Sequence, residues 1–356
     1  MFNRAFIYLL ILFVLILTFW GEIIFNDKVL YVRDTLLFST PMKYFLHQAI
    51  HTEASIFWNP TIFNGFSFYN DLQSGIFYPL SLIFYQEDFV SALNSYIFLH
   101  YFLAAVFFFF LARILNFSNL VALCGTVVYT FNGYAISTAG LLNNLQAYIW
   151  LPFIILNIEY VLRSTLFLQS LSCKGNREEE LTDSVSLKEK INKESKLPFL
   201  SKEGLAIIFL PVTLACSFYA GEPQVCIFNF FIICFYLPFR TELWGSNIAA
   251  CSSMLSRTSP FKEDLHPSST HLSKSSIFNG TFFLILFLVI FGTIILIIPA
   301  FFPALEGYQH SVRSMSELGY QHATQYSLAL ENLVELFYPL DFSQSLMTTF
   351  EIGKGE

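Results

Sequence analysis

Residues 31–80 read YVRDTLLFSTPMKYFLHQAIHTEASIFWNPTIFNGFSFYNDLQSGIFYPL, a polar and aromatic stretch between two long apolar runs. The stretch contains two turn signatures, Trp58-Asn59-Pro60 and Asn64-Gly65, because Pro fixes φ while Asn and Gly accept a positive φ. We therefore predict a large folded loop, residues 26–88, between two membrane-spanning helices. The charged and histidine side chains of the quoted stretch are Arg33, Asp34, Lys43, His47, His51, Glu53 and Asp71.

The composition on either side of this loop is that of a membrane protein. The chain is 55% hydrophobic and 13% charged, with 43 Phe and a mean hydropathy of +0.57. A soluble domain has about a quarter charged residues, and apolar runs of about 20 residues are long enough to cross a bilayer as helices. We predict an all-α polytopic membrane protein. The net charge of −7 is spread through the loops and favours no nucleic-acid partner.

Seven apolar segments are predicted to span the membrane. The first is longer than the apolar core of a signal peptide and has no small-residue cleavage site after it, so we interpret it as an anchored helix. A further piece, residues 75–85, is too short to span and is predicted to be re-entrant or interfacial. The seven segments are residues 5–25, 89–111, 119–137, 144–162, 204–219, 224–239 and 277–298.

The distribution of Lys and Arg predicts a cytoplasmic N-terminus. Two hydrophilic inserts, residues 163–202 and 240–276, contain eight and four basic residues. The loop at 26–88 and the tail at 299–356 contain three and two. The inserts are therefore predicted to be cytoplasmic, and their Lys/Glu/Ser-rich and Ser-rich compositions are typical of disordered spacers. The loop, the tail and the turn Gly221-Glu222-Pro223 would then face outward together.

Reactive groups are scarce inside the predicted spans. The exception at mid-depth is His100, which we interpret as a neutral, hydrogen-bonded histidine rather than a proton relay. The six cysteines show no CxxC and no zinc-type spacing, and the chain contains no nucleotide-binding fingerprint. A transporter normally has ionisable groups around a mid-membrane site. The sequence instead predicts chemistry at the outer membrane–water interface.

Short motifs in a fixed order carry a family resemblance. They are Arg33-Asp34 with Pro41, Trp58-Asn59-Pro60, Asn64-Gly65, Phe77-Tyr78-Pro79-Leu80, Phe131-Asn132-Gly133-Tyr134, Leu151-Pro152, Gly221-Glu222-Pro223-Gln224, Pro303-Ala304-Leu305-Glu306 with Ser311 and Arg313, Tyr326-Ser327, and Tyr338-Pro339. Together they resemble the YfhO-type family of bacterial membrane proteins, within the GT-C superfamily of polytopic glycosyltransferases. The family often has His at the position of Glu222, and its members continue beyond this length with more helices.

The resemblance implies a fold and an activity. The fold would be a GT-C-like transmembrane helix bundle over residues 1–356, incomplete at its C-terminus. The activity would be transfer of a sugar from a polyprenyl-phosphate-linked donor to an acceptor polymer, lipid or protein outside the bacterial cytoplasmic membrane. Membrane lipid would be the other partner. No cofactor is required, because no paired acidic motif accompanies Asp34, although a divalent cation is compatible with the site. The rival functions are a flippase or transporter of a lipid-linked or polymeric substrate, and a non-catalytic membrane scaffold.

The resemblance also implies roles for individual residues. Asp34 would act as the general base and Glu222 as a second catalytic carboxylate; Arg33 and Arg313 would grip the donor phosphate. The alternatives are an N-cap role for Asp34 on a helix starting at Thr35, and a solvated turn role for Glu222. The other substrate-binding candidates, each with a structural alternative, are Lys43, Glu306, Asn64, Asp71 and Asn132.

Overall fold

The structure is a computed structural model that describes residues 2–26, 28–30, 34–162, 202–237, 239–240 and 280–310. The chain divides into two compact units, Met1–Leu305 and Glu306–Glu356. Apart from Lys202 and Arg240, the two predicted inserts lie outside the described residues.

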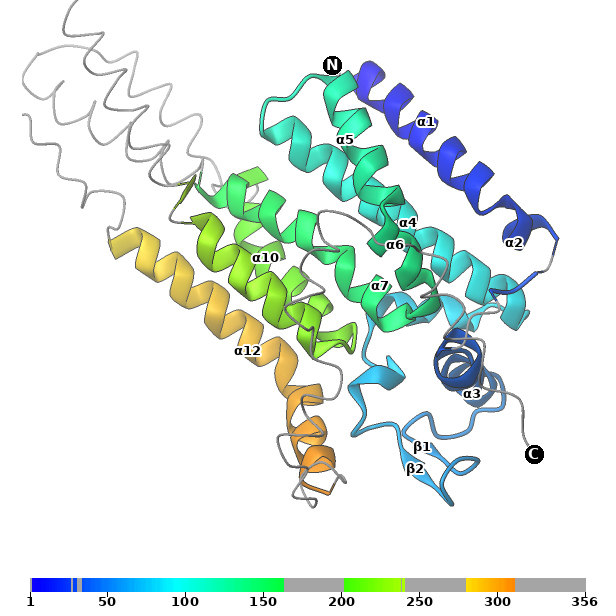
Figure 1. The fold of residues 1–356 in the computed structure, drawn as a ribbon. Helices are drawn as coiled ribbons and strands as arrows, with labels where there is room; N and C mark the ends of the chain where they lie inside the picture. The colour runs from blue at the N-terminus through cyan, green and yellow to red at the C-terminus, as the bar shows by residue number, and fades with distance from the viewer. Residues whose placement is uncertain are drawn as a thin grey trace, which may run out of the picture. The chain divides into compact units, whose positions relative to one another are not determined.

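The described chain is mainly helical, as predicted (Figure 1). Among these residues, three helices are long and apolar enough to cross a membrane, and a bent pair makes a fourth span if it is counted as one. The three are α4 (Phe89–Ile114), the helix Leu142–Leu162, which begins with α7 (Leu142–Tyr148), and the stretch Leu284–Gln309 of α12 (Gly280–Gln309). The other predicted spans form shorter apolar helices at Ala5–Phe19, Leu205–Tyr219 and Pro223–Leu237.

The bent pair combines α5 (Asn119–Phe131) with the segment Gly133–Gly140, at an angle of 41°. This segment contains α6 (Gly133–Ser137) and the 3-10 turn η4 (Thr138–Gly140). The sequence predicts one continuous helix here. It breaks because Asn132 has an extended backbone and its side chain accepts a 2.8 Å hydrogen bond from the N–H of Ala135, which starts a new helix.

Two other predicted boundaries also differ. The first apolar run forms α1 (Phe2–Phe19) and a short α2 (Gly21–Phe25), because Trp20 leaves the helical conformation between them. Helix α12 continues to Gln309 through Pro299 and Pro303, so the start of the predicted tail at residue 299 is helical. Helix α10 (Lys202–Tyr219) also contains an internal proline.

The predicted loop is folded. It begins with a π-helical turn, η1 (Thr35–Ser39), that runs into α3 (Thr40–His51). The antiparallel strands β1 (Trp58–Asn59) and β2 (Phe66–Ser67) form a small hairpin. The 3-10 turns η2 (Leu72–Ser74) and η3 (Pro79–Tyr85) complete it, and η3 falls in the piece predicted to be re-entrant or interfacial.

The predicted turn signatures explain the hairpin. Its tip contains Phe63, Asn64 and Gly65, all with positive φ (52°, 61° and 117°). Only glycine fits the last position, since a Cβ there would lie 2.3 Å from the ring of Trp58.

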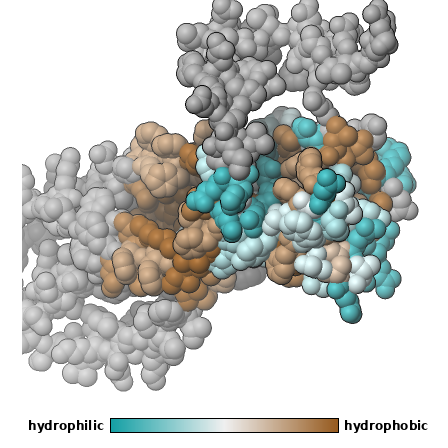
Figure 2. All heavy atoms as spheres, turned by 90° about the horizontal axis from the view of Figure 1, so that it is seen from below, coloured by the Kyte–Doolittle hydropathy of each residue, from teal (hydrophilic) through white to brown (hydrophobic). Residues whose placement is uncertain are grey.

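Figure 2 shows the molecule from below, which is the side on which the hairpin lies in Figure 1. On this face, hydrophilic surface is concentrated over one part of the molecule, and hydrophobic surface lies beside it.

The loop packs onto the N-terminal half of α4 through a buried aromatic cluster. Tyr78 and Phe84 from the loop contact Tyr96 of α4, and all three rings are almost fully buried. His100 lies against the same group. Its Nδ1 donates to the carbonyl of Tyr96 at 2.6 Å, so its Nε2 accepts from the hydroxyl of Tyr78 at 2.9 Å. His100 is therefore hydrogen-bonded on both nitrogens in the neutral form.

Candidate functional site

Asp34 lies at the start of η1 with its side chain exposed. Its backbone is already helical (φ −77°, ψ −27°), and within the described chain its side chain makes no capping hydrogen bond. The helical turn does begin at Thr35, as the N-cap interpretation expects, but the capping bond itself is not made. The carboxylate is therefore directed to the surface and is accessible to another molecule.

The neighbouring residue fixes the position of Asp34. The hydroxyl of Thr35 is fully buried and donates a 2.8 Å hydrogen bond to the carbonyl of Gly140 in η4. This bond ties the first turn of the loop to the bent end of the α5–α6 pair. The bond fixes the chain next to Asp34, while the Asp34 side chain stays exposed to solvent.

Gly140, which accepts the hydrogen bond from Thr35, also lines a groove. The groove has a volume of about 600 Å³ and an open mouth, and it runs between the α1–α2 break and the α6–η4 segment. Its lining is mainly apolar, with Glu22 and Ser137 as the polar exceptions, and Glu22 is paired with Lys28 at 3.0 Å. The apolar lining residues are Phe19, Trp20, Ile23, Leu30, Ile136 and Ala139.

Glu222 lies in the turn between α10 and the helix Pro223–Leu237. Gly221 adopts φ 79° and approaches η2 so closely that a Cβ would lie 2.4 Å from the carbonyl oxygen of Leu72. Glu222 is half-buried, and this burial raises the pKa of its carboxyl group. A hydrogen bond from the backbone N–H of Gln224 lowers the same pKa by a smaller amount.

The residues next to both predicted carboxylates are connected to one segment, residues 132–148. Thr35 bonds Gly140 near the middle of that segment. Gly221 packs on Leu72 and Gln73 of the loop, and Asn143 of the segment donates to the carbonyl of Gln73 at 3.4 Å. Asp34 and Glu222, which are 188 residues apart in sequence, therefore each follow or precede a residue that is packed near this segment.

Lys43 occupies a different environment from the one expected of a phosphate ligand. Its side chain is 1% exposed, donates to the carbonyl of Ser74 at 3.1 Å, and lies 5.9 Å from the ring centre of Tyr96. Gly75 makes room for it, since a Cβ there would lie 2.3 Å from Nζ. Burial lowers the pKa of Lys43 to about 8, against the opposing effect of Asp71. This ammonium tethers the loop and does not face solvent.

Three other predicted ligands have structural partners. Asp71 accepts from the N–H of Gln73 at 2.9 Å and caps η2; burial raises its pKa, opposed by that bond and by Lys43. Asn64 forms the exposed hairpin tip. Asn132 caps α6 and donates to the hydroxyl of Tyr148 at 3.0 Å. Each of these structural roles corresponds to the structural alternative considered from the sequence.

The remaining predicted ligands lie elsewhere. Arg33 and Arg313 lie outside the described residues, and Glu306 is exposed in the second compact unit. Within the described ranges, no group of three or more His, Cys, Asp or Glu side chains is placed to hold a metal ion.

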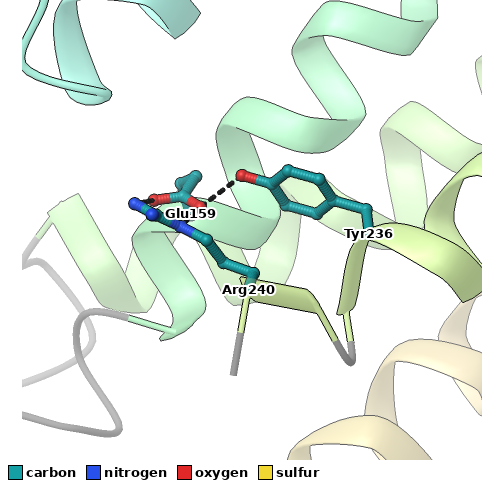
Figure 3. Close-up of polar contacts among 3 residues, drawn as sticks. All are labelled: Glu159, Tyr236 and Arg240. Atoms are coloured by element: carbon teal, nitrogen blue, oxygen red, sulfur yellow. Dashed lines mark hydrogen bonds and ion pairs between the residues drawn. The ribbon is translucent and has the colours of Figure 1, made fainter. Parts of the chain in front are cut away.

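A buried ion pair marks another polar cluster (Figure 3). Glu159 of the span Leu142–Leu162 is fully buried and receives two hydrogen bonds from Arg240, at 2.6 and 3.0 Å. The hydroxyl of Tyr236 donates to the same carboxylate. These contacts fasten the end of the helix Pro223–Leu237 to the neighbouring span, so we assign the cluster a structural role.

Comparisons with known proteins identify no family for this chain. No family model, curated protein or solved structure matches the chain.

The sequence did not predict the cluster of tyrosine side chains around Asn132. Tyr129, Tyr134 and Tyr148 lie together around Asn132. Only the Phe131-Asn132-Gly133-Tyr134 motif pointed to this place.

Proposed function

We propose that this chain is a membrane glycosyltransferase that moves a sugar from a polyprenyl-phosphate-linked donor to an acceptor outside the cytoplasmic membrane. The observation that carries the proposal is the exposed carboxylate of Asp34, whose neighbour Thr35 bonds Gly140, a lining residue of an open, mainly apolar groove of about 600 Å³. An apolar groove suits an isoprenoid chain, and an exposed carboxylate suits an acceptor hydroxyl. The motif resemblance points to the same chemistry.

In the proposed reaction, the Asp34 carboxylate takes the proton of the acceptor hydroxyl as its oxygen attacks the anomeric carbon. The bond from that carbon to the phosphate oxygen breaks, and the lipid phosphate leaves with the bonding electron pair. Arg33 and Arg313 are proposed to neutralise the phosphate, because a guanidinium binds phosphate in a bidentate manner. The reaction needs no redox cofactor, and a divalent cation is optional.

The test is Asp34→Asn in the full chain, reconstituted in lipid nanodiscs with a panel of polyprenyl-phosphate sugars. Removal of a general base lowers the rate by roughly 10²–10⁴-fold. Glu53→Gln, which neutralises another exposed loop carboxylate, is the matched control and should keep wild-type activity. Full transfer activity in Asp34→Asn would overturn the assignment of Asp34.

The same groove would also suit a lipid flippase, and the Asp34 variant separates the two functions. A flippase moves lipid without breaking a glycosidic bond, so it should form no glycosylated product and should tolerate loss of a general base. We favour transfer because His100, the polar group at mid-depth of α4, is satisfied by Tyr78 and Tyr96 rather than facing a pathway.

The proposed location is the bacterial cytoplasmic membrane, with the N-terminus in the cytoplasm. Single cysteines at Ser186 and Ser269 should then resist a membrane-impermeant thiol reagent in intact cells, whereas one at Ser67 should react. The background must lack the native exposed thiols Cys124 and Cys234. Equal labelling at all three positions would overturn this orientation.

A further inference from the structure

The β1–β2 hairpin presents aromatic rings on its surface and contains no charged side chain. Residues 54–70, which include both strands, contain no Asp, Glu, Lys, Arg or His. Charged residues border this segment on both sides, at Glu53 and Asp71. The exposed rings of the segment are Phe57, Trp58, Phe63 and Tyr69. Exposed apolar surface gathered in one place is typical of an interaction site.

The tip of the hairpin holds its most exposed ring on a strained backbone. Phe63 is 86% exposed and has φ 52°, in the left-handed region that bulky side chains rarely adopt. The next two residues, Asn64 and Gly65, also have positive φ, but both residue types accept it. An exposed apolar ring and a strained backbone both cost free energy in water. A partner that covers the Phe63 ring would offset both costs.

A row of ring contacts connects the hairpin with the helices α10 and α12. None of its six rings is buried, and the centroids of successive rings lie 5.5, 5.8, 6.0, 6.2 and 6.5 Å apart. The rings, in order from the hairpin, are those of Phe57, Tyr69, Phe77, Tyr219, Phe218 and Phe301. A hydrogen bond from the hydroxyl of Tyr219 to the carbonyl of Leu296 joins α10 to α12 at the same place.

Helix α12 has the surface of a lipid-facing helix. Its stretch Leu284–Gln309 is long and apolar enough to cross a membrane, and most of that stretch is exposed. Aromatic side chains near the ends of spanning helices are typical of the boundary between the bilayer and water. The row of rings therefore makes the hairpin surface continuous with a surface that is suited to lipid.

We propose that the β1–β2 hairpin is an anchor in the membrane–water interface, with its exposed rings among the lipid headgroups and the first acyl carbons of the leaflet on the loop's side. Rings of Trp and Tyr suit this zone, because the apolar body is covered while the polar atom stays hydrated. The inference does not depend on the proposed transferase activity. It means that the loop lies on the membrane surface and is attached there between the two spans that flank it.

A sugar or a protein partner fits the hairpin less well. A sugar site needs polar groups that converge beside the rings. The side-chain oxygen of Asn59 instead accepts from the N–H and the hydroxyl of Thr61, at 2.9 and 2.6 Å, and Ser67 donates to Asn70 at 3.2 Å. A protein interface normally has a polar rim around its apolar centre. The hairpin segment, residues 54–70, has no charged side chain to supply one.

The first test identifies what touches the tip. The full chain with Phe63→p-benzoylphenylalanine is placed in liposomes of equal parts phosphatidylcholine and phosphatidylglycerol, with maltotriose in the buffer, and is then irradiated. The control is Glu87→p-benzoylphenylalanine, at an exposed charged position of the same loop. We expect mass spectrometry to find lipid adducts at position 63 and few at position 87. An adduct with maltotriose or with a second copy of the chain, no adduct at position 63, or equal lipid yields at the two positions would overturn the inference.

The second test uses Phe63→Asn, in which strain relief and membrane contact have opposite effects. Asn accepts a positive φ, so without a lipid contact the hairpin should open less often than in the wild type. If the ring is buried in the interface, its loss in nanodiscs should speed hydrogen exchange of the strand amides by about tenfold, the effect of exposing one largely buried aromatic ring. Phe117→Asn, which removes another exposed phenylalanine far from the hairpin in sequence, should leave this exchange unchanged.

A comparison in amphipol separates the lipid contact from contacts within the hairpin. Amphipol covers the apolar helices but offers no layer of lipid headgroups, so Phe63→Asn should not speed exchange there. The ring of Phe63 also contacts that of Phe66, with centroids 6.1 Å apart. Equal acceleration in nanodiscs and in amphipol would assign the effect to this contact and overturn the anchor. Unchanged or slower exchange in nanodiscs would overturn it as well.

Discussion

The buried hydroxyl of Thr35 and the carbonyl of Gly140 are joined by a 2.8 Å hydrogen bond across 105 residues of sequence. Each of these two residues belongs to a different part of the candidate site. Thr35 follows Asp34, and Gly140 lines the apolar groove. The position of the proposed base relative to the proposed lipid site therefore depends on this contact.

Replacing Thr35 with Val should expose that dependence. The variant keeps the shape of the side chain but leaves a buried carbonyl without its donor, which costs about 1–3 kcal/mol. We expect lower thermal stability in detergent and reduced transfer, with Thr35→Ser close to wild type on both. The control is Thr52→Val, which removes an exposed hydroxyl bonded to Gln48. Wild-type stability and activity in Thr35→Val would show that the bond does not position Asp34.

The turn before Glu222 offers a matched pair of glycines. Gly221→Ala places a Cβ at positive φ and 2.4 Å from the Leu72 carbonyl, whereas a Cβ at Gly133 meets no atom within 4 Å. We expect Gly221→Ala to lower the free energy of unfolding by about 2 kcal/mol or more, from backbone strain and overpacking together. Gly133→Ala should leave it unchanged or raise it slightly. Similar melting temperatures for the two variants would contradict the close packing of the turn on η2.

Burial of Lys43 should make the free energy of unfolding depend on pH. Its pKa is about 8 in the folded chain against 10.5 for a free side chain, so between these values the unfolded state binds more protons. Stability due to Lys43 should therefore rise as the pH increases from 8 to 10.5, by about 3 kcal/mol in total. The full cost of burying the ammonium applies below pH 8.

The measurement is the difference in unfolding free energy between wild type and Lys43→Met, followed across this pH range. Other titrating groups are common to both proteins and largely cancel in the difference. Lys28→Met, which removes an exposed lysine, is the control. A wild-type-minus-variant difference that stays constant from pH 8 to pH 10.5 would show that Lys43 is not a buried charge.

Some of this architecture could be predicted from local sequence, and some could not. The turn residues around Asn64-Gly65 predict the hairpin, and an apolar run after Asp88 predicts α4, because both depend on neighbours in the chain. The break at Asn132 depends on one capping bond within an otherwise apolar run, which periodicity does not detect. The contact of Thr35 with Gly140 depends on tertiary packing and has no local signal.

The site residues divide in the same way, into those that the flanking sequence indicates and those whose role depends on tertiary packing. Asp34 is exposed and Glu222 lies in a tight turn, which their flanking sequence indicates. Lys43 looks identical in sequence to a surface lysine, and only its burial against Ser74 and Tyr96 shows its role.

The Glu159–Arg240 pair provides the last prediction, a double-mutant cycle. Glu159 is fully buried and Arg240 is 20% exposed, so removal of either partner should cost about 3 kcal/mol of unfolding free energy, mostly from the charge left behind. The double variant Glu159→Gln/Arg240→Gln should lose much less than the sum of the single variants, because no buried charge remains unpaired. The exposed pair of Lys28 and Glu22 is the control, and Lys28→Gln should show no measurable change in stability. Strictly additive losses in the cycle would mean that the two side chains do not stabilise each other, and the clamp between Leu142–Leu162 and Pro223–Leu237 would have to rest on Tyr236 instead.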